Sequence, residues 1–347
     1  MALLEIRNLT TQFRTKNGIV NALRDVSYTV EAGQVFGVVG ESGSGKSVSM
    51  LTLMGLLAEN SVIPQGRITF EDRDISPANL DTRKKKDAYE AKMRAIRGND
   101  ISMIFQDPMT FLNPILKIGT QMTEGILSHE KISKREARAR AIELMREVGI
   151  PAPEKRLDQY PFEFSGGMRQ RIIIAIALAC HPKLIIADEP TTALDVTVQA
   201  QILELIKGIT KDTGAAVIMI THDLGVVATL CDRIAIMYAG EIVEEGTTDE
   251  IFYGPRHPYT LGLLGSIHNS EKDDSEPLVP IPGTPPDLTK LPPGCAFTAR
   301  CKSAMHICQL QHPPETTISP GHRCACWLHS MDESLIELPI LGREGKE

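Results

Sequence analysis

The segment Gly40–Ser47, with the sequence Gly-Glu-Ser-Gly-Ser-Gly-Lys-Ser, constrains the fold more than any other part of this chain. It fits the pattern G-x-x-x-x-G-K-[ST], in which glycines let the backbone wrap closely around phosphate groups. The apolar run Gln34–Val39 precedes it and the apolar stretch Val48–Leu57 follows it, as the strand and helix of this motif should. We therefore expect a loop that binds the phosphates of a nucleoside triphosphate at a helix N-terminus.

The residues of this loop have different expected roles. Lys46 would reach the β- and γ-phosphates, and the Ser47 hydroxyl would bind Mg²⁺. Backbone N–H groups of the other residues would point at the phosphates. We expect nucleotide contacts from Gly40, Ser42, Gly43, Ser44, Gly45, Lys46, Ser47 and Val48.

A second motif follows the apolar run Leu184–Ala187. This run, like Ala216–Thr221, is short and continuously apolar, which predicts strands buried on both faces of a parallel sheet. Such a strand would carry Asp188 to the carboxyl edge of the sheet, where its carboxylate can hold Mg²⁺ through water. The adjacent Glu189 is predicted to polarise the attacking water.

A third motif, Phe164–Gln170, resembles the signature sequence of the ATP-binding cassette (ABC) ATPases. Met168 replaces the Gln that is more frequent at its position, but the phosphate-facing residues Ser165, Gly166 and Gly167 are intact. In that family this segment faces the phosphate loop of the opposite subunit, so ATP is bound between two subunits. The following helix, expected to run to about Ala179, would place its N-terminus at the phosphates.

The resemblance extends to the smaller motifs of the family. Gln106 resembles the Q-loop glutamine, Asp195 ends a segment similar to the D-loop, and His222 resembles the switch histidine that contacts the γ-phosphate. Phe13 lies where the family places an aromatic residue on adenine, with Tyr28 as the alternative. The resemblance thus implies ATP hydrolysis, with catalytic roles for Glu189, His222, Gln106 and Lys46, and with Mg²⁺ bound by Ser47, Gln106 and Asp188.

The implied fold is the α/β P-loop NTPase fold of the ABC type. It comprises a parallel core sheet with helices, an antiparallel β subdomain and a helical signature subdomain at about 107–180. We expect the ATPase domain at 1–265, a Pro-rich linker and small cysteine-rich extension at 266–330, and a flexible tail at 331–347. The linker prediction rests on Glu271–Pro293, which holds seven prolines and therefore cannot form a helix or a central strand.

Three segments are similar to one branch of the family, the ATPases of oligopeptide/dipeptide permeases. They are Asp107–Pro114 after the Q-loop glutamine, Arg256–Thr260 before the Pro-rich stretch, and Ser165–Arg171, which points to the D-type subunit. The resemblance covers residues 3 to about 328. We expect Asp107–Pro114, and within it Phe111 and Leu112, to couple ATP binding to the membrane subunits.

The resemblance implies an ATP-hydrolysing subunit of a peptide importer, a translocase located peripherally at the cytoplasmic face of the cell membrane. Its partners would be a second, F-type ABC ATPase, two integral membrane permease subunits and an extracytoplasmic peptide-binding protein. Another cargo (nickel, an opine or a sugar) remains an alternative, as does a soluble ABC protein acting on nucleic acid or ribosomes.

Charge and hydropathy agree with a chain that binds no nucleic acid and spans no membrane by itself. The formal net charge is −7, and the basic cluster Arg83–Lys86 lies among acidic residues, which favours a solvated helix face over a nucleic-acid patch. The longest apolar run, Ile172–Cys180, is far shorter than the roughly 18 residues that a bilayer requires.

The chain has seven cysteines, of which Cys180 and Cys231 stand alone in apolar contexts and are expected to be inert core thiols. The others cluster near the C-terminus and lack the closely spaced pairs typical of zinc sites. Their spacing is compatible with an iron–sulfur cluster, a zinc site or no metal. Members of the permease family carry a [4Fe–4S] cluster there. The resemblance gives Cys295, Cys301, Cys308 and Cys326 as its ligands and Cys324 as an extra thiol or substitute ligand. We expect the nearby His306, His312 and His322 to be surface residues and not ligands.

Overall fold

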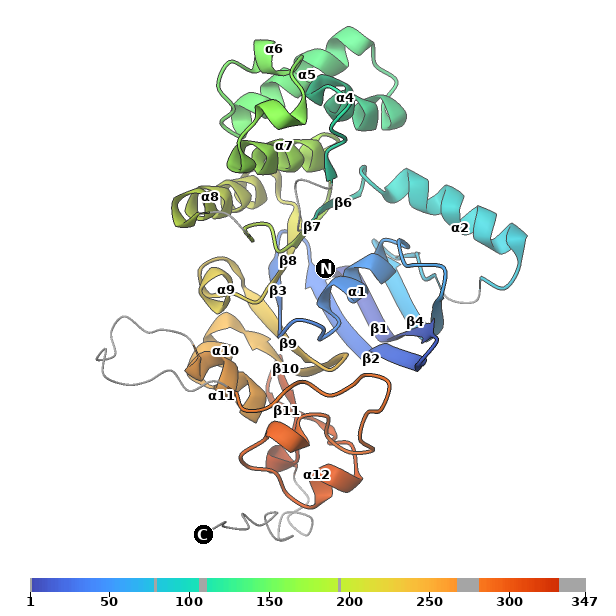
Figure 1. Ribbon diagram of the computed structural model, residues 1–347, viewed down its shortest axis with the longest axis vertical. Coiled ribbons are helices and arrows are strands. Elements are labelled where there is room, and N and C mark those ends of the chain that lie inside the picture. Colours follow the sequence, from blue (N-terminus) through green and yellow to red (C-terminus); the bar gives the residue numbers. More distant parts are fainter. Residues whose placement is uncertain (1, 78–79, 106–110, 193–194, 267–280, 331–347) are drawn as a thin grey trace. The chain divides into compact units, whose positions relative to one another are not determined.

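The computed structural model describes residues 2–77, 80–105, 111–192, 195–266 and 281–330 (Figure 1). The chain divides into two compact units, each formed by several stretches of sequence. The first unit comprises Met1–Leu4, Thr29–Phe36 and Thr69–Ile220, and the second comprises Glu5–Tyr28, Gly37–Ile68 and Thr221–Glu347.

Parallel strands form the core of the first unit. β6 (Ile101–Ile104), β7 (Leu184–Asp188) and β8 (Ala216–Thr221) are buried along their whole length. They pair in parallel, with Leu184 opposite both Ile101 and Ala216, and the strand order is β3-β8-β7-β6. β3 (Val35–Val39) is equally buried. The prediction of short strands buried on both faces is therefore confirmed.

Helices α4 (Ile118–His129), α5 (Lys134–Glu147), α6 (Pro153–Arg156) and α7 (Gly166–Leu178) gather at one end of this unit (Figure 1). α5 begins with a capping box in which Ser133 and Glu136 satisfy each other's backbone N–H groups. The buried positions of α5 are Ala137, Ala141, Leu144 and Met145. They recur at helical spacing, as the sequence predicts.

Two further helices among the described residues belong to the first unit. α2 (Arg83–Ile96) exposes its basic first turn to solvent, where Lys85 pairs with Asp81 at 2.7 Å. Arg83–Lys86 are all exposed on this helix, as a solvated helix face requires. α8 (Val196–Thr213) begins at the N-cap Asp195 and ends at Gly214, which has a left-handed φ of 69°.

The second unit holds the loop Gly40–Ser47 and most of the sheet β2-β1-β4, formed by β1 (Ala2–Thr15), β2 (Gly18–Glu31) and β4 (Ser61–Phe70). The sheet continues to β5 (Arg73–Asp74), which pairs antiparallel with the end of β4. Helix α1 spans Lys46–Leu53, so it begins earlier and ends earlier than the expected Val48–Leu57. It stops because Met54 caps it and Gly55 adopts a φ of 63°, outside the helical region.

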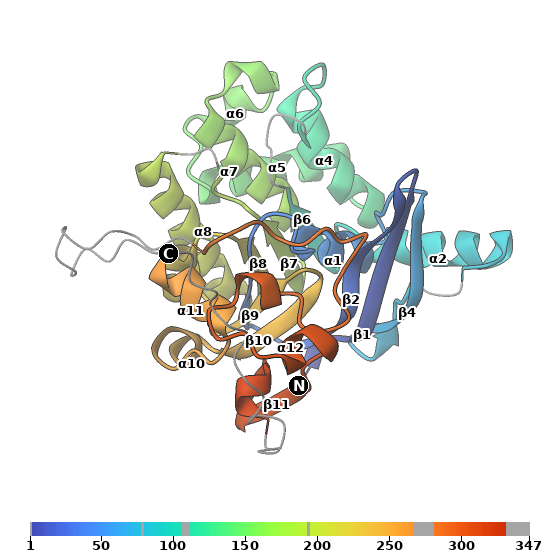
Figure 2. The same ribbon diagram turned by 60° about the horizontal axis from the view of Figure 1, so that its bottom comes forward.

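The second unit also contains α9 (Leu224–Leu230), β9 (Arg233–Tyr238), β10 (Glu241–Thr247), α10 (Thr248–Tyr253) and α11 (Pro258–Gly265). Beyond them, the described part of the Pro-rich stretch, residues 281–293, forms no helix or strand. The cysteine-rich part of the extension, as described over residues 294–330, has only short elements (Figure 2). They are η2 (Thr298–Arg300), α12 (Ile307–Leu310), β11 (Glu315–Ser319), β12 (His322–Ala325) and η3 (Trp327–His329).

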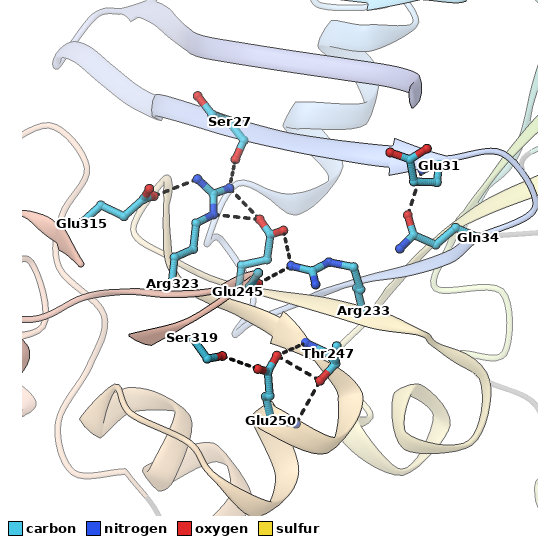
Figure 3. Close-up of polar contacts among 11 residues, drawn as sticks. Ser27, Glu31, Gln34, Arg233, Glu245, Thr247, Glu250, Glu315, Ser319 and Arg323 are labelled. Carbon is cyan, nitrogen blue, oxygen red and sulfur yellow. Dashed lines mark hydrogen bonds and ion pairs between the residues drawn. The ribbon is translucent and has the colours of Figure 1, made fainter. Parts of the chain in front are cut away.

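The extension is built into the sheet of the second unit. β12 pairs antiparallel with β10, placing Cys324 opposite Glu244, and the strand order is β11-β12-β10-β9-β3. Charged side chains reinforce this pairing (Figure 3). Glu245 binds Arg323 of β12 at 2.6 Å and Arg233 of β9 at 3.0 Å, and Arg323 also donates to the Ser27 carbonyl.

Among the described residues, no helix combines the length and the apolar composition that crossing a membrane requires.

Candidate functional site

The loop Gly40–Ser47 wraps tightly against its own unit. A side chain at Gly40 would place its Cβ 2.1 Å from the Met237 carbonyl oxygen, and one at Gly45 would meet the Ala22 carbonyl oxygen at 2.6 Å. Gly45 also has a φ of 105°, which residues with side chains rarely adopt. Two of the motif glycines are therefore required by the backbone path of the loop.

Lys46 begins helix α1 and is buried, with only 6% of its surface exposed. Its Nζ donates to the carbonyl oxygens of Gly40 at 2.7 Å and Glu41 at 3.0 Å. A buried ammonium held against the loop places positive charge where a phosphate would lie. The helix N-terminus adds to this positive potential.

Ser44 provides a test of whether the loop suits a nucleotide. Its Oγ is buried and has no hydrogen-bond partner among the described residues, an arrangement that is costly unless a ligand or water supplies one. Gly43, by contrast, has open space around it. Ser42 is exposed, while Ser47 and Val48 are half-buried at the start of α1. The loop therefore provides the Ser44 hydroxyl, the Lys46 ammonium and an uncrowded backbone at Gly43, which are groups that a Mg²⁺-bound triphosphate would need.

The two candidates for adenine contact differ in exposure. Phe13 of β1 is half-buried, so part of its ring can meet a ligand. Tyr28 of β2 is 4% exposed, and burial raises the pKa of its hydroxyl. The structure thus excludes Tyr28 as a stacking platform in this conformation and leaves Phe13. His222 follows β8 and is exposed, two residues before α9 begins.

Asp188 and Glu189 lie in the first unit, where β7 ends. Asp188 is 6% exposed and Glu189 is half-buried. Glu189 has a φ of 47°, a left-handed conformation that is strained for a residue with a long side chain. It is held there by its N–H, which donates to the Ile220 carbonyl at 2.9 Å, and by Thr192, whose Oγ1 donates to Glu189 Oε2 at 2.9 Å.

The signature segment forms the exposed N-terminus of α7, also in the first unit. Ser165 is its N-cap and accepts a hydrogen bond from the Met168 N–H at 3.4 Å. Ser165 and Gly166 are exposed, whereas a Cβ on Gly167 would meet Val198 of α8 at 2.8 Å. α7 ends at Leu178, one residue short of the expected Ala179.

Several expected site residues lie outside the described residues. These are Gln106, the following residues 107–110, and Ala193 and Leu194 of the D-loop segment. Asp195 is described: it is exposed and caps α8, accepting a hydrogen bond from the Val198 N–H at 2.9 Å.

Four cysteines line one small pocket in the C-terminal extension: Cys295, Cys301, Cys308 and Cys326. The aromatic residues Phe297 and Trp327 line it as well. Cys324 does not: it is 1% exposed on β12. The pocket therefore contains the four residues expected as ligands and leaves out the extra thiol.

Backbone groups are directed at the sulfurs of this pocket. Cys295, Cys301 and Cys326 each accept a hydrogen bond from a backbone N–H two residues ahead, at Phe297, Ser303 and Leu328 respectively. Such bonds stabilise thiolates bound to metal and tune iron–sulfur centres. Without a metal, burial raises the pKa of Cys295 to about 11 and that of Cys326 to about 12. Within the described residues, no group of three or more His, Cys, Asp or Glu side chains is arranged as a ready metal site.

The exposure of Cys180, Cys231 and His322 can be compared with what the sequence predicts. Cys180 and Cys231 are buried, and burial raises the pKa of both thiols, which agrees with inert core residues. The expectation for His322 was wrong. It is 3% exposed because β12 packs on β10, where its Nε2 lies 2.9 Å from Glu244 Oε1.

Sequence reasoning missed two residues that contact the phosphate loop from other segments. Arg300 of the extension binds the Glu41 carboxylate, and the Tyr259 hydroxyl accepts a hydrogen bond from the Glu41 N–H at 2.9 Å. Tyr259 belongs to the segment Arg256–Thr260, which the sequence analysis identified only by its similarity to the permease ATPases, without a role for Tyr259. No local pattern in the sequence links Glu41 with Arg300, since 259 positions separate them.

Comparison with known proteins agrees with this geometry. The profile of the ABC transporter family matches residues 23–192, which include the phosphate loop, the signature segment and Glu189. The profile of the oligopeptide/dipeptide transporter C-terminal region matches residues 243–308. The oligopeptide transport ATP-binding protein OppD of Bacillus subtilis is 52% identical over 338 residues, covering 97% of this chain and 92% of that protein. The chain belongs to the ATP-binding subunits of the oligopeptide/dipeptide branch of ABC transporters. It is an ATPase of this family.

Other relatives cover the chain as fully. The dipeptide transport ATP-binding protein DppD of Bacillus subtilis is 52% identical and covers 99% of both chains. The OppD protein of Escherichia coli is 47% identical, covering 94% of this chain and 93% of that protein. Among solved structures, a dimeric post-hydrolysis state of the ATP-binding cassette MJ0796 bound to ADP and Pi matches with a TM-score of 0.60 and 27% identity. It covers 71% of this chain and 98% of that one, so the ABC fold expected from the sequence is confirmed.

Proposed function

We propose that this ATPase energises an importer of di- and oligopeptides, acting as its D-type subunit beside an F-type ABC ATPase. Two integral membrane subunits and an extracytoplasmic peptide-binding protein complete the complex, with the ATPases peripheral on its cytoplasmic face. The observation that carries the proposal is the C-terminal match. Residues 243–308 resemble the C-terminal region of peptide transporters, and this region continues through β10 into the sheet of the second unit.

Each unit contributes a distinct part of the proposed ATP chemistry. In the second unit, the loop Gly40–Ser47 binds the phosphates, Lys46 neutralises their charge and Phe13 stacks on adenine. His222 contacts the γ-phosphate. In the first unit, Glu189 accepts a proton from the attacking water and Ser165–Gly167 face the ATP of the partner ATPase. Mg²⁺, when bound, offsets phosphate charge; Ser47, Asp188 and Gln106 are its proposed ligands.

A small apolar surface in the first unit is the proposed contact with the membrane subunits. Phe111 is 38% exposed and Ile115 is 78% exposed. Leu112, the other residue expected to couple ATP binding to the membrane subunits, is 2% exposed, which is too buried for a direct contact. Its part in coupling stays a prediction. Its side chain is buried while those of its neighbours Phe111 and Asn113 are exposed. We assign the contact to Phe111 and Ile115.

A photo-crosslinking amino acid at Ile115 tests the contact and the partners together. In detergent-solubilised membranes, we expect it to capture a multi-span membrane protein, identified by mass spectrometry. The same amino acid at Ile19 of β2, an isoleucine that is 50% exposed, is the control and should capture none. Capture of ribosomal or nucleic-acid-binding proteins from Ile115, or of nothing, would contradict the proposal.

We also propose that the cysteine pocket holds a [4Fe–4S] cluster, with Cys295, Cys301, Cys308 and Cys326 as ligands. The shared pocket and the N–H groups directed at three of the sulfurs support it. A cluster there would link short elements that have little core of their own. One small cluster of buried residues in the extension comprises Met305, Ile307, Cys308 and Trp327, with Cys295 packed against it.

Anaerobic purification tests this cluster. We expect about four iron and four sulfide ions per chain, as a [4Fe–4S] centre requires. Cys326→Ser should lose most of both, and Cys324→Ser, the matched control, should keep them because Cys324 lies outside the pocket. Zinc in place of iron, or iron that depends on Cys324 rather than Cys326, would show the assignment to be wrong.

The proposed boundaries remain those expected from the sequence, with the ATPase domain at 1–265, the linker and extension at 266–330 and the tail at 331–347. The tail lies outside the described residues.

A further inference from the structure

Arg300 is a buried arginine in the cysteine-rich extension, one position before Cys301. Only 4% of its side chain is exposed. Its guanidinium forms a bidentate ion pair with the Glu41 carboxylate, with Nη1–Oε2 at 2.5 Å and Nη2–Oε1 at 2.9 Å. Paired hydrogen bonds of this kind fix the orientation of both side chains. Glu41 is the second residue of the phosphate loop.

The remaining groups around Arg300 hold its guanidinium in place. Nε donates to the Pro282 carbonyl at 2.9 Å, and Nη1 lies 3.4 Å from the Tyr238 hydroxyl. The guanidinium carbon lies 5.8 Å from the centroid of the Tyr238 ring and 5.9 Å from that of Phe297. Cation–π contact in a desolvated setting adds to the ion pair. Arg300 is thus a fixed anchor and not a mobile surface side chain.

Glu41 connects Arg300 to the groups that are proposed to contact the nucleotide. Its carbonyl oxygen accepts from Lys46 Nζ at 3.0 Å and from the Ser44 N–H at 3.2 Å. Its own N–H donates to the Tyr259 hydroxyl at 2.9 Å. Tyr259 packs on Tyr238, with ring centroids 4.6 Å apart. A shift of Glu41 would therefore displace both the lysine and the orphaned hydroxyl of Ser44.

We propose that Arg300 is a positioning residue for ATP binding, through which the C-terminal extension holds the phosphate loop in its binding conformation. The loop of this ATPase is then completed by a residue from outside the part of the chain that carries the nucleotide motifs. The proposal depends on neither the peptide cargo nor the cluster, because it rests on the ion pair and on the ATPase activity of the family alone.

Arg300→Met tests the proposal in the full-length chain by equilibrium binding of a fluorescent ATP analogue. We expect affinity to fall by roughly ten-fold, within the range of typical coupling between sites. In the assembled transporter, KM for ATP should rise by a similar factor while kcat changes less, because Arg300 touches no reacting atom.

Arg323→Met is the matched control. Arg323 also ties the extension to other parts of the second unit, through Glu245 and the Ser27 carbonyl (Figure 3). Its hydrogen-bond partners, Glu245, Glu315 and Ser27, all lie outside the phosphate loop. Its loss should leave ATP affinity within about two-fold of the wild type, as expected for a distant, independent site. Equal losses from Arg300→Met and Arg323→Met would show a merely structural role and overturn the proposal.

Glu41→Gln keeps the test decisive if Arg300→Met folds poorly. It preserves the shape of the side chain and removes its charge, so it should weaken ATP binding in the same direction. The double variant should be no weaker than the more affected single variant, because both act on one contact. Additive losses, or unchanged affinity in Glu41→Gln, would contradict a route through this ion pair.

Discussion

Glu189→Gln is expected to stop ATP turnover at this chain's site while leaving ATP binding intact. The glutamine keeps the volume of the side chain and can still accept the hydrogen bond from Thr192 that holds Glu189 at the end of β7. It cannot take a proton from water, and loss of such a base typically costs about 10²- to 10⁴-fold in rate. The left-handed backbone at Glu189 is unaffected by the substitution, so the strained geometry of the site remains.

The measurement must separate this site from the one on the partner ATPase. In the assembled transporter, a photoreactive ATP crosslinked to this chain should remain triphosphate in Glu189→Gln and become diphosphate in the wild type. Glu143→Gln, the same change at an exposed position of α5, should behave as the wild type. Rapid conversion to diphosphate in Glu189→Gln would remove Glu189 from the catalytic role.

The second large effect is expected from Lys46→Met, which should weaken ATP binding itself. Hydrogen bonds to charged groups contribute about 1.5–3 kcal/mol each, so losing one from the phosphates predicts a fall in affinity of roughly 10- to 150-fold. The substitution also removes the donor shared by the carbonyls of Gly40 and Glu41, which relaxes the loop. Both effects act in the same direction.

Equilibrium binding of MgATP to the full-length chain measures this loss. Lys290→Met is the control, because Lys290 is exposed in the same unit and the substitution removes one positive charge in the same way. The two variants should differ by at least ten-fold in affinity. If Lys46→Met bound ATP as tightly as Lys290→Met, Lys46 would not contact the phosphates.

The parts of the fold that could be predicted are those with a strong local cause. β7 and β8 are short apolar runs between polar segments, and α5 shows its buried face at helical spacing. The phosphate loop could be placed because its glycines satisfy a backbone path that other residues would block. The strands and the helix face depend on neighbours in sequence, so periodicity reveals them. The loop is found by the spacing of its glycines, lysine and serine, although the atoms that crowd its glycines come from Ala22 and Met237.

What could not be predicted depends on contacts between distant segments. The burial of His322 follows from the pairing of β12 with β10, and nothing near His322 in the sequence indicates a carboxylate partner. Leu112 is buried although its neighbours on both sides are exposed, and no local pattern marks it as different from them. The ion pair of Arg300 with Glu41 connects the phosphate loop to the C-terminal extension, in which the sequence analysis considered only the cysteines and histidines. Contacts between residues so far apart in the chain produce no periodic pattern in a single sequence, so they could not be predicted from it.

The most direct test of the peptide-importer account is ATP-driven peptide uptake by the complete complex in proteoliposomes. MgATP is trapped inside, and the binding protein and a labelled di- and oligopeptide mixture are supplied outside. The account predicts that peptide accumulates with the wild-type chain and does not accumulate when this chain carries Glu189→Gln. Accumulation of nickel, an opine or a sugar in place of peptide, or no ATP-dependent uptake at all, would contradict it.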